Sequence, residues 1–282
     1  MRKIPTAILM SGSGSNARKI IEYNSKFLDI RLILSDNPAS NYRSIARDFN
    51  IDQALNNIYR FYGVEPGKVS AAGRKRFRDK QKRLTFDALT DKILKGYDIE
   101  LIAAAGYNWL LSPLLCNNYI IVNVHPGDLR VRDEAGKRKY IGLGWIPTAK
   151  ALLNGEQSVY TTTHLVTAEL DGGAIARVSA PVDVGTFENF DRRQLLPSGV
   201  TLKELIRDVN NNGGNEYGSA LLYSRSKELQ EKLKVVGDWR EFPITMHQVA
   251  DYMLQGRLHR DESGLIMVAG REAFDLFLTG GV

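Results

Sequence analysis

The chain has 282 residues, 43% hydrophobic and 25% charged, which is ordinary for a soluble globular protein with one large domain or one domain and an appendage. Its single cysteine excludes an intramolecular disulfide, and no apolar run reaches the roughly 18 residues that a membrane helix needs, so we expect a cytoplasmic protein without membrane contact. The net charge is +6, and the excess of basic residues is confined to RKRFRDKQKR at residues 74–83. The rest of the chain has equal numbers of basic and acidic residues, which excludes a surface that is basic throughout.

Apolar runs of strand length follow one another along the first half of the chain, with helical stretches between them. The runs are Ile4–Met10, Ile30–Leu34, Ile99–Ala105 and Ile120–Val124, and the helical stretches are residues 16–24, 41–50, 85–95 and 147–154. Continuous apolar strands that alternate with helices are typical of a parallel sheet covered on both faces. We therefore predict an α/β, Rossmann-like, mostly parallel sheet with helices on both faces.

The first predicted strand passes directly into SGSGSNARKI, residues 11–20, which has the composition of a phosphate-binding loop. Small residues let backbone N–H groups approach an anion, and the N-terminus of the next helix adds a favourable dipole. Gly12, Gly14 and Ala17 also fit the dinucleotide spacing, and Asp36 ends the next strand, about where such folds place a ribose-binding acid. The loop alone is thus compatible with a phosphorylated substrate, a dinucleotide, or a tight turn capped by serines.

The basic run at residues 74–83 has seven basic residues and one acidic residue. A solvated loop or helix face explains such a run more often than a binding site does, but a polyanion site stays an alternative. Phe77 is the only aromatic residue within the run, so it offers few stacking platforms for single-stranded nucleic acid. We therefore do not expect nucleic acid as the main partner.

Three polar residues that suit acyl transfer lie near the predicted ends of strands. Asn123 and His125 are two residues apart at the end of the fourth run, so they point to the same side of the sheet, at the strand ends where α/β folds bind ligands. Asp171 lies in the turn LDGG between two predicted edge strands, at residues 160–166 and 175–184. The amide can donate to a developing oxyanion, the imidazole can move protons, and the carboxylate can raise the imidazole pKa and position a water.

The composition changes after residue 186. Helical stretches at residues 201–209, 219–234 and 244–255 are followed by a predicted hairpin across HRDESGLIMVAG, residues 259–270. We therefore predict a catalytic domain over residues 1–186 and a mainly helical extension over residues 187–282 that packs on it.

The chain resembles the 10-formyltetrahydrofolate-dependent formyltransferase family through four motifs in order. They are SGSGSN at 11–16, AGYNWLLSP at 105–113, NVHP at 123–126 and THLVTAELDGG at 163–173, and together they anchor about residues 4–184. The resemblance is greatest to members that formylate glycinamide ribonucleotide in purine biosynthesis. It implies the formyltransferase fold, with 10-formyltetrahydrofolate as co-substrate and no metal or redox cofactor.

The resemblance also implies roles for individual residues. It assigns Asn123, His125 and Asp171 as the catalytic trio, with His164 as a supporting residue. The substrate phosphate would lie on Gly12, Gly14, Ser15 and Asn16. The folate pocket would be lined by Asn108, Trp109, Leu110, Leu111, Val166 and Glu169.

The chain departs from the family at the acceptor site and, through the basic run, near the folate entrance. Gly127–Arg130 replaces the family's Ser-Leu-Leu-Pro, the charged loop VRDEAGKRK at 131–139 and the basic run at 74–83 are insertions, and Asp238 is the counterpart of an acidic ribose contact. We expect glycinamide ribonucleotide as the acceptor, with an amino sugar nucleotide or another amine as the alternative. A dinucleotide-dependent oxidoreductase and a nucleic-acid-binding protein are the alternatives from other classes. We expect small-molecule substrates and a monomer or homodimer.

Overall fold

A computed structural model describes most of the chain. The described residues are 2–65, 77, 79–185, 194–212, 214–217, 220–262 and 264–278. Residues 74–76 and 78 of the basic run lie outside this set, as does the predicted domain boundary at residue 186. The role of the full basic run and the division into residues 1–186 and 187–282 therefore stay predictions.

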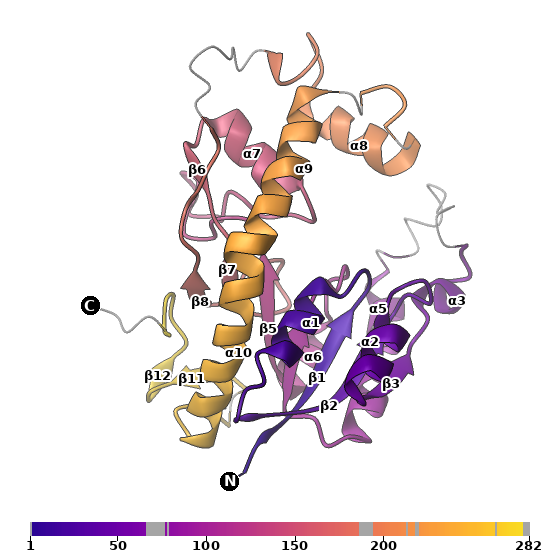
Figure 1. The fold of residues 1–282 in the computed structure, drawn as a ribbon, viewed down its shortest axis with the longest axis vertical. Helices are drawn as coiled ribbons and strands as arrows, with labels where there is room; N and C mark the ends of the chain where they lie inside the picture. Colours follow the sequence, from indigo (N-terminus) through magenta and orange to yellow (C-terminus); the bar gives the residue numbers. More distant parts are fainter. Residues whose placement is uncertain are drawn as a thin grey trace. The chain divides into compact units, whose positions relative to one another are not determined.

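The largest sheet has seven strands in the order β3-β2-β1-β4-β5-β7-β8 (Figure 1). Its first five strands in this order pair in parallel, which confirms the predicted parallel sheet. The hairpin strands at residues 160–166 and 175–184 were expected at an edge, and β7 and β8 are the last two strands. The strands are β1 (Ile4–Met10), β2 (Leu28–Ser35), β3 (Asp52–Leu55), β4 (Leu101–Ala104), β5 (Ile120–His125), β7 (Thr162–Leu165) and β8 (Ile175–Val178).

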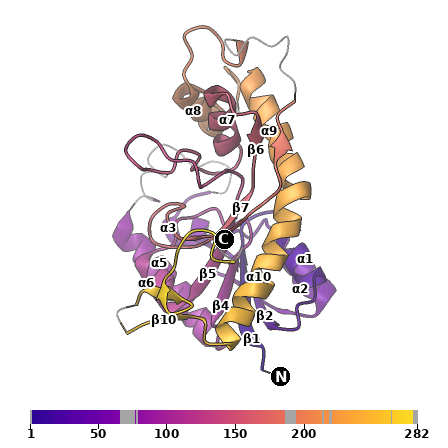
Figure 2. The ribbon, with the colours of Figure 1, turned by 90° about the vertical axis from the view of Figure 1, so that its left-hand side faces the viewer.

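Helices cover both faces of this sheet, as predicted. Along β1, Ile8 and Met10 pack with residues of α1, α2 and α10, whereas Ala7 and Leu9 pack with residues of α5 and α6. This alternation follows from the two-residue period of a strand, because each face of an apolar strand is buried under a helical layer. Figure 2 shows the two layers on opposite sides of the strands. The helices are α1 (Ser15–Glu22), α2 (Tyr42–Phe49), α5 (Lys80–Lys95), α6 (Pro113–Asn118) and α10 (Trp239–Leu254).

The helix expected over residues 85–95 begins earlier, at Lys80. Its N-cap is Asp79, whose carboxylate accepts hydrogen bonds from the backbone N–H groups of Gln81 and Lys82. An aspartate at the N-cap satisfies N–H groups that have no partner within the helix. The end of the basic run is therefore the first turn of a helix. The short elements β3 and α3 (Ile58–Tyr62) were not predicted at all.

The chain forms two compact units, and each one is assembled from separate segments. The first contains residues 1–124, 163–177 and 239–282, and the second contains residues 125–162 and 178–238. The second unit has its own apolar core, in which Tyr140 and Leu152 pack with Leu205, Leu229 and Leu233. Its elements are α7 (Ile146–Asn154), β6 (Ser158–Val159), β9 (Val182–Asp183), α8 (Leu202–Asn212), α9 (Leu221–Leu233) and the π-helix η2 (Lys234–Asp238).

The C-terminal part is mainly helical, as predicted, and α8, α9 and α10 correspond to the three expected helices. The expected hairpin is formed by β10 (Leu258–Arg260) and β11 (Ile266–Val268), which pair antiparallel, and β12 (Arg271–Glu272) adds a third strand. None of the helices in the described ranges is both long and apolar enough to cross a membrane.

Candidate functional site

The predicted phosphate loop connects β1 to α1 in the first unit. Gly12 and Ser13 are exposed, and Gly14 is the N-cap of α1, with a left-handed backbone at φ 73°. A Cβ atom on Gly14 would lie 2.3 Å from Cδ1 of Ile45, whereas one on Gly12 would meet nothing within 4 Å. Gly14 is thus required by the fold, and Gly12 leaves open space in front of the helix N-terminus. Such an N-terminus is a favourable place for an anion.

Asp36 cannot act as the ribose-binding acid that the dinucleotide alternative requires. It follows β2 and is fully buried, with 0% of its surface exposed. Burial raises the pKa of its carboxyl above the usual value, although the nearby Ser11 and Trp109 side chains and the Arg83 charge act in the opposite direction. A buried acid cannot present a carboxylate to a ribose at the surface.

Ser11 ties the phosphate loop to the segment predicted to line the folate pocket. Its hydroxyl accepts a hydrogen bond from the backbone N–H of Asn108 at 3.0 Å, and its own backbone N–H donates to the carbonyl of Gly106 at 3.0 Å. On the other side, Asn37 donates to the carbonyl of Ser11 at 2.9 Å. Ser11 is 5% exposed, so these bonds are shielded from water.

The predicted folate-lining residues differ in how far they are exposed. Asn108 and Leu110 are exposed, Leu110 by 52%, and both can contact a ligand, whereas Leu111 is 4% exposed and belongs to the core. Trp109 and Val166 are partly buried against the same apolar cluster as Leu111, so both predicted folate segments pack on one cluster of the first unit.

Trp109 also packs against the basic insertion. Its ring lies 4.5 Å from that of Phe77, between centroids, and Phe77 in turn lies 4.7 Å from Tyr62. Glu169, the last predicted folate residue, is exposed in the turn before Asp171.

Asn123, His164 and Asp171 meet in the first unit. The amide nitrogen of Asn123 lies 3.2 Å from Nε2 of His164, and Nδ1 of His164 lies 2.9 Å from the carbonyl oxygen of Leu165. A carbonyl only accepts, so Nδ1 carries the proton and the neutral ring accepts from Asn123 at Nε2. Nε2 is also 3.8 Å from a carboxylate oxygen of Asp171. His164 thus holds the amide of Asn123, whose NH₂ has a second hydrogen to donate.

The LDGG turn presents Asp171 to this group. Asp171 has φ 50°, a left-handed conformation that is uncommon for a residue with a side chain, and it is 9% exposed. The turn packs tightly, because a Cβ atom on Gly173 would lie 1.9 Å from the carbonyl oxygen of Leu165. The strained aspartate is therefore fixed by its neighbours.

His125 ends β5 and is the first residue of the second unit. It is 2% exposed, and its Nε2 lies 2.7 Å from the carbonyl oxygen of Tyr140, to which it donates. A Cβ atom on Gly127 would lie 2.8 Å from this Nε2 and 2.6 Å from the same carbonyl oxygen. The departure from the family's serine at residue 127 therefore leaves room for the contact between His125 and Tyr140.

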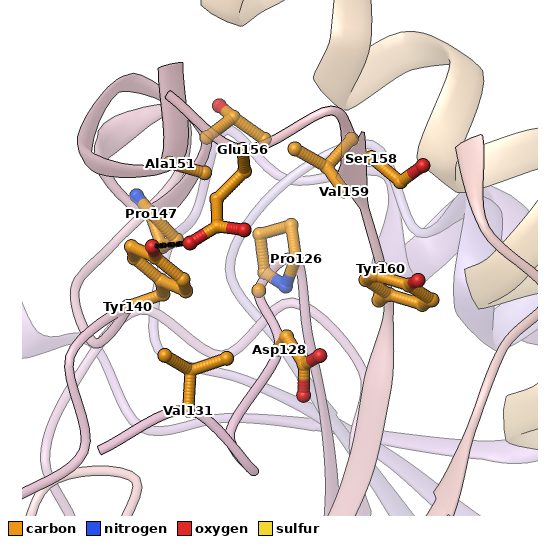
Figure 3. Close-up of a pocket in the computed structure, with 12 residues that line it drawn as sticks. Pro126, Asp128, Val131, Tyr140, Pro147, Ala151, Glu156, Ser158, Val159 and Tyr160 are labelled. Carbon is orange, nitrogen blue, oxygen red and sulfur yellow. Dashed lines mark hydrogen bonds between the residues drawn. The ribbon is translucent and has the colours of Figure 1, made fainter. Parts of the chain in front are cut away.

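A pocket in the second unit lies beside these residues (Figure 3). It encloses about 280 Å³ of empty space, part of it open to solvent. Its lining residues are Pro126, Gly127, Asp128, Val131, Tyr140, Pro147, Thr148, Ala151, Glu156, Ser158, Val159 and Tyr160. In Figure 3 the hydroxyl of Tyr140 points at the carboxylate of Glu156, to which it donates a hydrogen bond.

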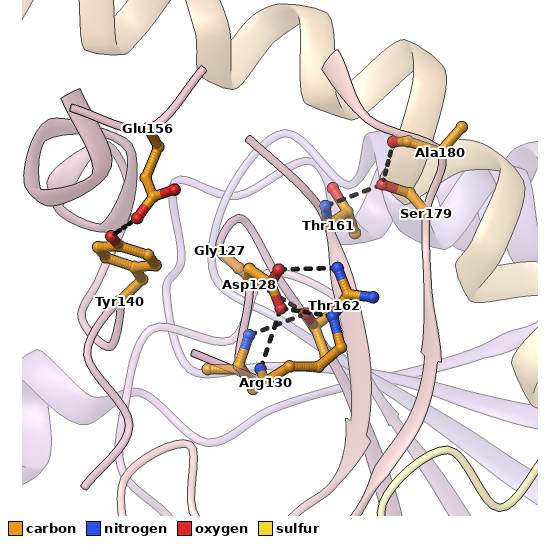
Figure 4. Close-up of polar contacts among 10 residues, drawn as sticks. Gly127, Asp128, Arg130, Tyr140, Glu156, Thr161, Thr162, Ser179 and Ala180 are labelled. Carbon is orange, nitrogen blue, oxygen red and sulfur yellow. Dashed lines mark hydrogen bonds and ion pairs between the residues drawn. The ribbon is translucent and has the colours of Figure 1, made fainter. Parts of the chain in front are cut away.

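Asp128 and Arg130, which depart from the family sequence, form an ion pair at this pocket (Figure 4). Both side-chain nitrogens Nε and Nη2 of Arg130 donate to the Asp128 carboxylate, at 2.9 and 2.8 Å. The Arg130 guanidinium also lies 5.0 Å from the centre of the Tyr160 ring. Thr162 fixes the loop by donating to the carbonyl of Gly127 at 2.7 Å. These contacts hold the start of the loop in place, and the charges of Asp128 and Arg130 compensate each other.

Sequence reasoning missed that Arg83, the last residue of the basic run, is buried. Arg83 is 9% exposed and forms an ion pair with Asp87 at 2.7 Å and a hydrogen bond to the Tyr107 hydroxyl at 3.3 Å. Two of its nitrogens, Nε and Nη1, have no hydrogen-bond partner among the described residues. The spacing of four residues between Arg83 and Asp87 on one helix is the signal that could have separated it from the exposed Lys80 and Lys82.

Asp238 has a partner within the second unit. Its carboxylate accepts from the hydroxyl of Thr161 at 2.8 Å and is 7% exposed. Its predicted contact with a ribose stays a prediction. Within the described ranges, no group of His, Cys, Asp or Glu side chains is arranged to hold a metal ion.

The sequence matches known proteins over most of its length. The sequence model of the formyl transferase family matches residues 4–188. The phosphoribosylglycinamide formyltransferase of Haemophilus influenzae is 29% identical over 179 residues, which are 62% of this chain and 70% of that protein. The trifunctional purine biosynthetic protein adenosine-3 of Gallus gallus is 26% identical over 198 residues, or 68% of this chain, and this chain spans 17% of its length.

Solved structures share the fold. The phosphoribosylglycinamide formyltransferase of Coxiella burnetii has a TM-score of 0.59 at 19% identity, with 97% of this chain and 100% of that chain covered. The one from Anaplasma phagocytophilum has a TM-score of 0.58 at 16% identity, with 98% of both chains covered. The likeness confirms the predicted fold class over nearly the whole length.

Proposed function

Because the chain belongs to the formyl transferase family, we propose that it moves a formyl group from 10-formyltetrahydrofolate to the primary amine of glycinamide ribonucleotide. The acceptor is taken from relatives whose names specify it. The observation that carries the proposal is the contact of Asn123 and Asp171 with one buried imidazole, His164. An oriented amide N–H next to a shielded carboxylate suits the attack of an amine on a formyl carbon.

In the proposed reaction the neutral amine attacks the formyl carbon and forms a tetrahedral intermediate. Asn123 donates an N–H to the oxygen that becomes negative, and His125 stabilises the same charge as an imidazolium or transfers a proton. Asp171 accepts a proton from the attacking nitrogen through a water. The bond from the formyl carbon to N10 then breaks, N10 takes up the proton, and the products are the formamide and tetrahydrofolate.

We propose that the acceptor phosphate and the pterin of the donor bind to separate loops of the first unit. We propose that the acceptor phosphate binds Gly12, Ser15 and Asn16 in front of α1, where Gly12 leaves open space. Gly14 shapes this loop through its left-handed backbone. The pterin would lie against Asn108–Leu110, where Asn108 and Leu110 are exposed.

The test is transfer of formyl from 10-formyltetrahydrofolate to glycinamide ribonucleotide, followed by the change in folate absorbance. We expect turnover by the wild type and a loss of at least about a hundredfold in kcat for His125→Ala and Asp171→Asn. A wild type that binds the folate but leaves glycinamide ribonucleotide unchanged would refute the acceptor, and amino sugar nucleotides would be tried next. A wild type that binds no folate would refute the donor as well.

A further inference from the structure

The contact between His125 and Tyr140 fixes the protonation of the imidazole. The carbonyl of Tyr140 can only accept, so Nε2 of His125, 2.7 Å away, holds the proton and Nδ1 is the basic nitrogen of the neutral ring. The position of this carbonyl therefore determines which nitrogen of His125 takes part in proton transfer. It also determines the plane of the ring.

The side chain of Tyr140 is anchored at the far end of α7. Its hydroxyl donates to Glu156, and the amide of Asn154 donates to the same hydroxyl at 2.8 Å and to Glu156 at 3.0 Å. Tyr140 is 2% exposed, and burial followed by the bond to Glu156 raises the pKa of its phenol, so the hydroxyl remains a donor. Asn154 ends α7, and the left-handed Gly155 turns the chain so that Glu156 faces the same hydroxyl.

The charged insertion delivers Tyr140 to this position. Residues 131–139 form a closed hairpin, in which the N–H of Lys139 donates to the carbonyl of Val131 at 3.0 Å. Within it, Arg132 and Arg138 pair as an antiparallel bridge, and the Asp133 carboxylate accepts from the N–H of Lys137 at 2.8 Å. The insertion thus has a structural role that its charge did not indicate, since it ends directly at Tyr140.

We propose that Tyr140, clamped by Glu156 and Asn154, is a positioning residue that holds His125 in the Nε2–H form and orients it for formyl transfer. This inference rests on the proposed function, because His125 is there the group that acts on the reacting carbonyl. Tyr140, Asn154 and Glu156 act through His125 and do not touch the reacting atoms.

The first experiment compares Tyr140→Phe with Tyr160→Phe. The first change removes the hydroxyl that is anchored by Glu156 and Asn154 and keeps the ring, whereas the second removes a hydroxyl of the same pocket from a ring that packs on the Arg130 guanidinium. For Tyr140→Phe we expect kcat to fall by about tenfold to a hundredfold with the KM values nearly unchanged, because the imidazole is misplaced and not lost. For Tyr160→Phe we expect both constants to change by less than about twofold.

The second readout is the ¹⁵N NMR spectrum of the His125 ring. The ring signals of His125 are assigned as those that disappear in His125→Ala. We expect the wild type and Tyr160→Phe to show the Nε2–H tautomer, and Tyr140→Phe to show a mixture of tautomers. Glu156→Gln keeps an acceptor for the Tyr140 hydroxyl and should retain the tautomer, whereas Glu156→Ala should lose it. This rescue would not follow from a purely structural role of the pocket.

Wild-type kcat and an unchanged tautomer in Tyr140→Phe would overturn the proposal. If Tyr140→Phe does not fold, the same decision rests on Glu156→Gln against Glu156→Ala. If the wild type transfers no formyl group, the proposed function fails on its own, and the ring spectra still decide whether the clamp sets the state of His125.

Discussion

Single residues around the phosphate loop differ sharply in what they permit. Gly14 has a left-handed backbone that disfavours a side chain, and a methyl group there would displace the flexible ends of Ile45 and Met10, whereas Gly12 has ample room. His164, in the first unit, is buried and hydrogen-bonded to both Asn123 and the backbone, and its supporting role stays a prediction. The two glycines of the phosphate loop therefore have different roles, and substitutions at these two positions can distinguish an effect on folding from an effect on binding.

Gly14→Ala should destabilise the protein, and Gly12→Ala should not. The added methyl group at residue 14 would meet Ile45 and Met10 and force an unfavourable φ, for a cost of about 1–3 kcal/mol. For Gly12→Ala we expect the free energy of unfolding to change by no more than about 0.5 kcal/mol. We expect this variant to lose affinity for the phosphorylated substrate instead. Urea unfolding measures the free energy in both variants. Equal stabilities would show that the loop is not held as described.

Asp36→Asn should stabilise the protein at neutral pH. Burial raises the pKa of the Asp36 carboxyl in the folded state above its ordinary value of 3.8, so its favourable contribution exists below that value and is lost as the pH rises through the folded pKa. At pH 7 the asparagine variant should gain about 1 kcal/mol, because it has no charge to bury. The gain should disappear below about pH 4. Urea unfolding of both proteins across this pH range provides the measurement. A variant that is less stable than the wild type at pH 7 would contradict the prediction.

At the scale of elements, the loops after β1, β2 and β4 are connected by side-chain hydrogen bonds. Ser11 bonds to the loop after β4, and Asn37, after β2, bonds back to Ser11. Strands β2 and β4 both pair with β1, so their carboxyl ends lie at one edge of the sheet. The proposed acceptor and donor loops are therefore mechanically connected.

Ser11→Ala should weaken the coupling between the two substrates. The bond from Asn108 N–H to the Ser11 hydroxyl contributes about 1 kcal/mol, and its loss should reduce by roughly fivefold the effect that one bound substrate has on the affinity for the other. Ser13→Ala is the matched control, since Ser13 is exposed on the same loop. Calorimetric titrations of each substrate, with and without the other, measure this coupling. An unchanged coupling in Ser11→Ala would exclude the link.

The long apolar elements could be predicted from the sequence, and the short or locally bonded ones could not. β1 was predicted with its observed bounds, because seven consecutive buried residues leave a clear apolar run. β3 has four residues and a mixed pattern, and α5 begins at a capped aspartate inside a charged run, where apolar periodicity gives no signal. The contact of Asn123 with His164 and the Tyr140 clamp depend on packing between distant segments, and neither has a local signature.

At the scale of the whole molecule, the chain passes between the two compact units repeatedly. It does so after residues 124, 162, 177 and 238. The last segment, from Trp239 onward, completes the first unit, since Phe242, Met246 and Val249 belong to the same core as Ile8. The position of the predicted boundary at residue 186 therefore has a direct experimental consequence.

A fragment of residues 1–186 should not fold. It would lack α10 and expose the apolar face that α10 covers, and burial of each such side chain contributes about 1.5–3 kcal/mol. Circular dichroism and size-exclusion chromatography of this fragment beside the full chain provide the test. A monomeric fragment that unfolds cooperatively would support the boundary predicted from the sequence.

The single cysteine of the chain lies in α6, directly after the proposed donor segment. Its sulfur is 3.9 Å from the carbonyl oxygen of Leu111, Cys116 is 3% exposed, and burial raises the pKa of its thiol to about 11. Alkylating reagents attack the thiolate, so the intact protein should react with them only when this region opens. The rate at which the Cys116 sulfur is labelled would then measure how often the region of the proposed donor site opens. A folate that binds there should lower this labelling rate.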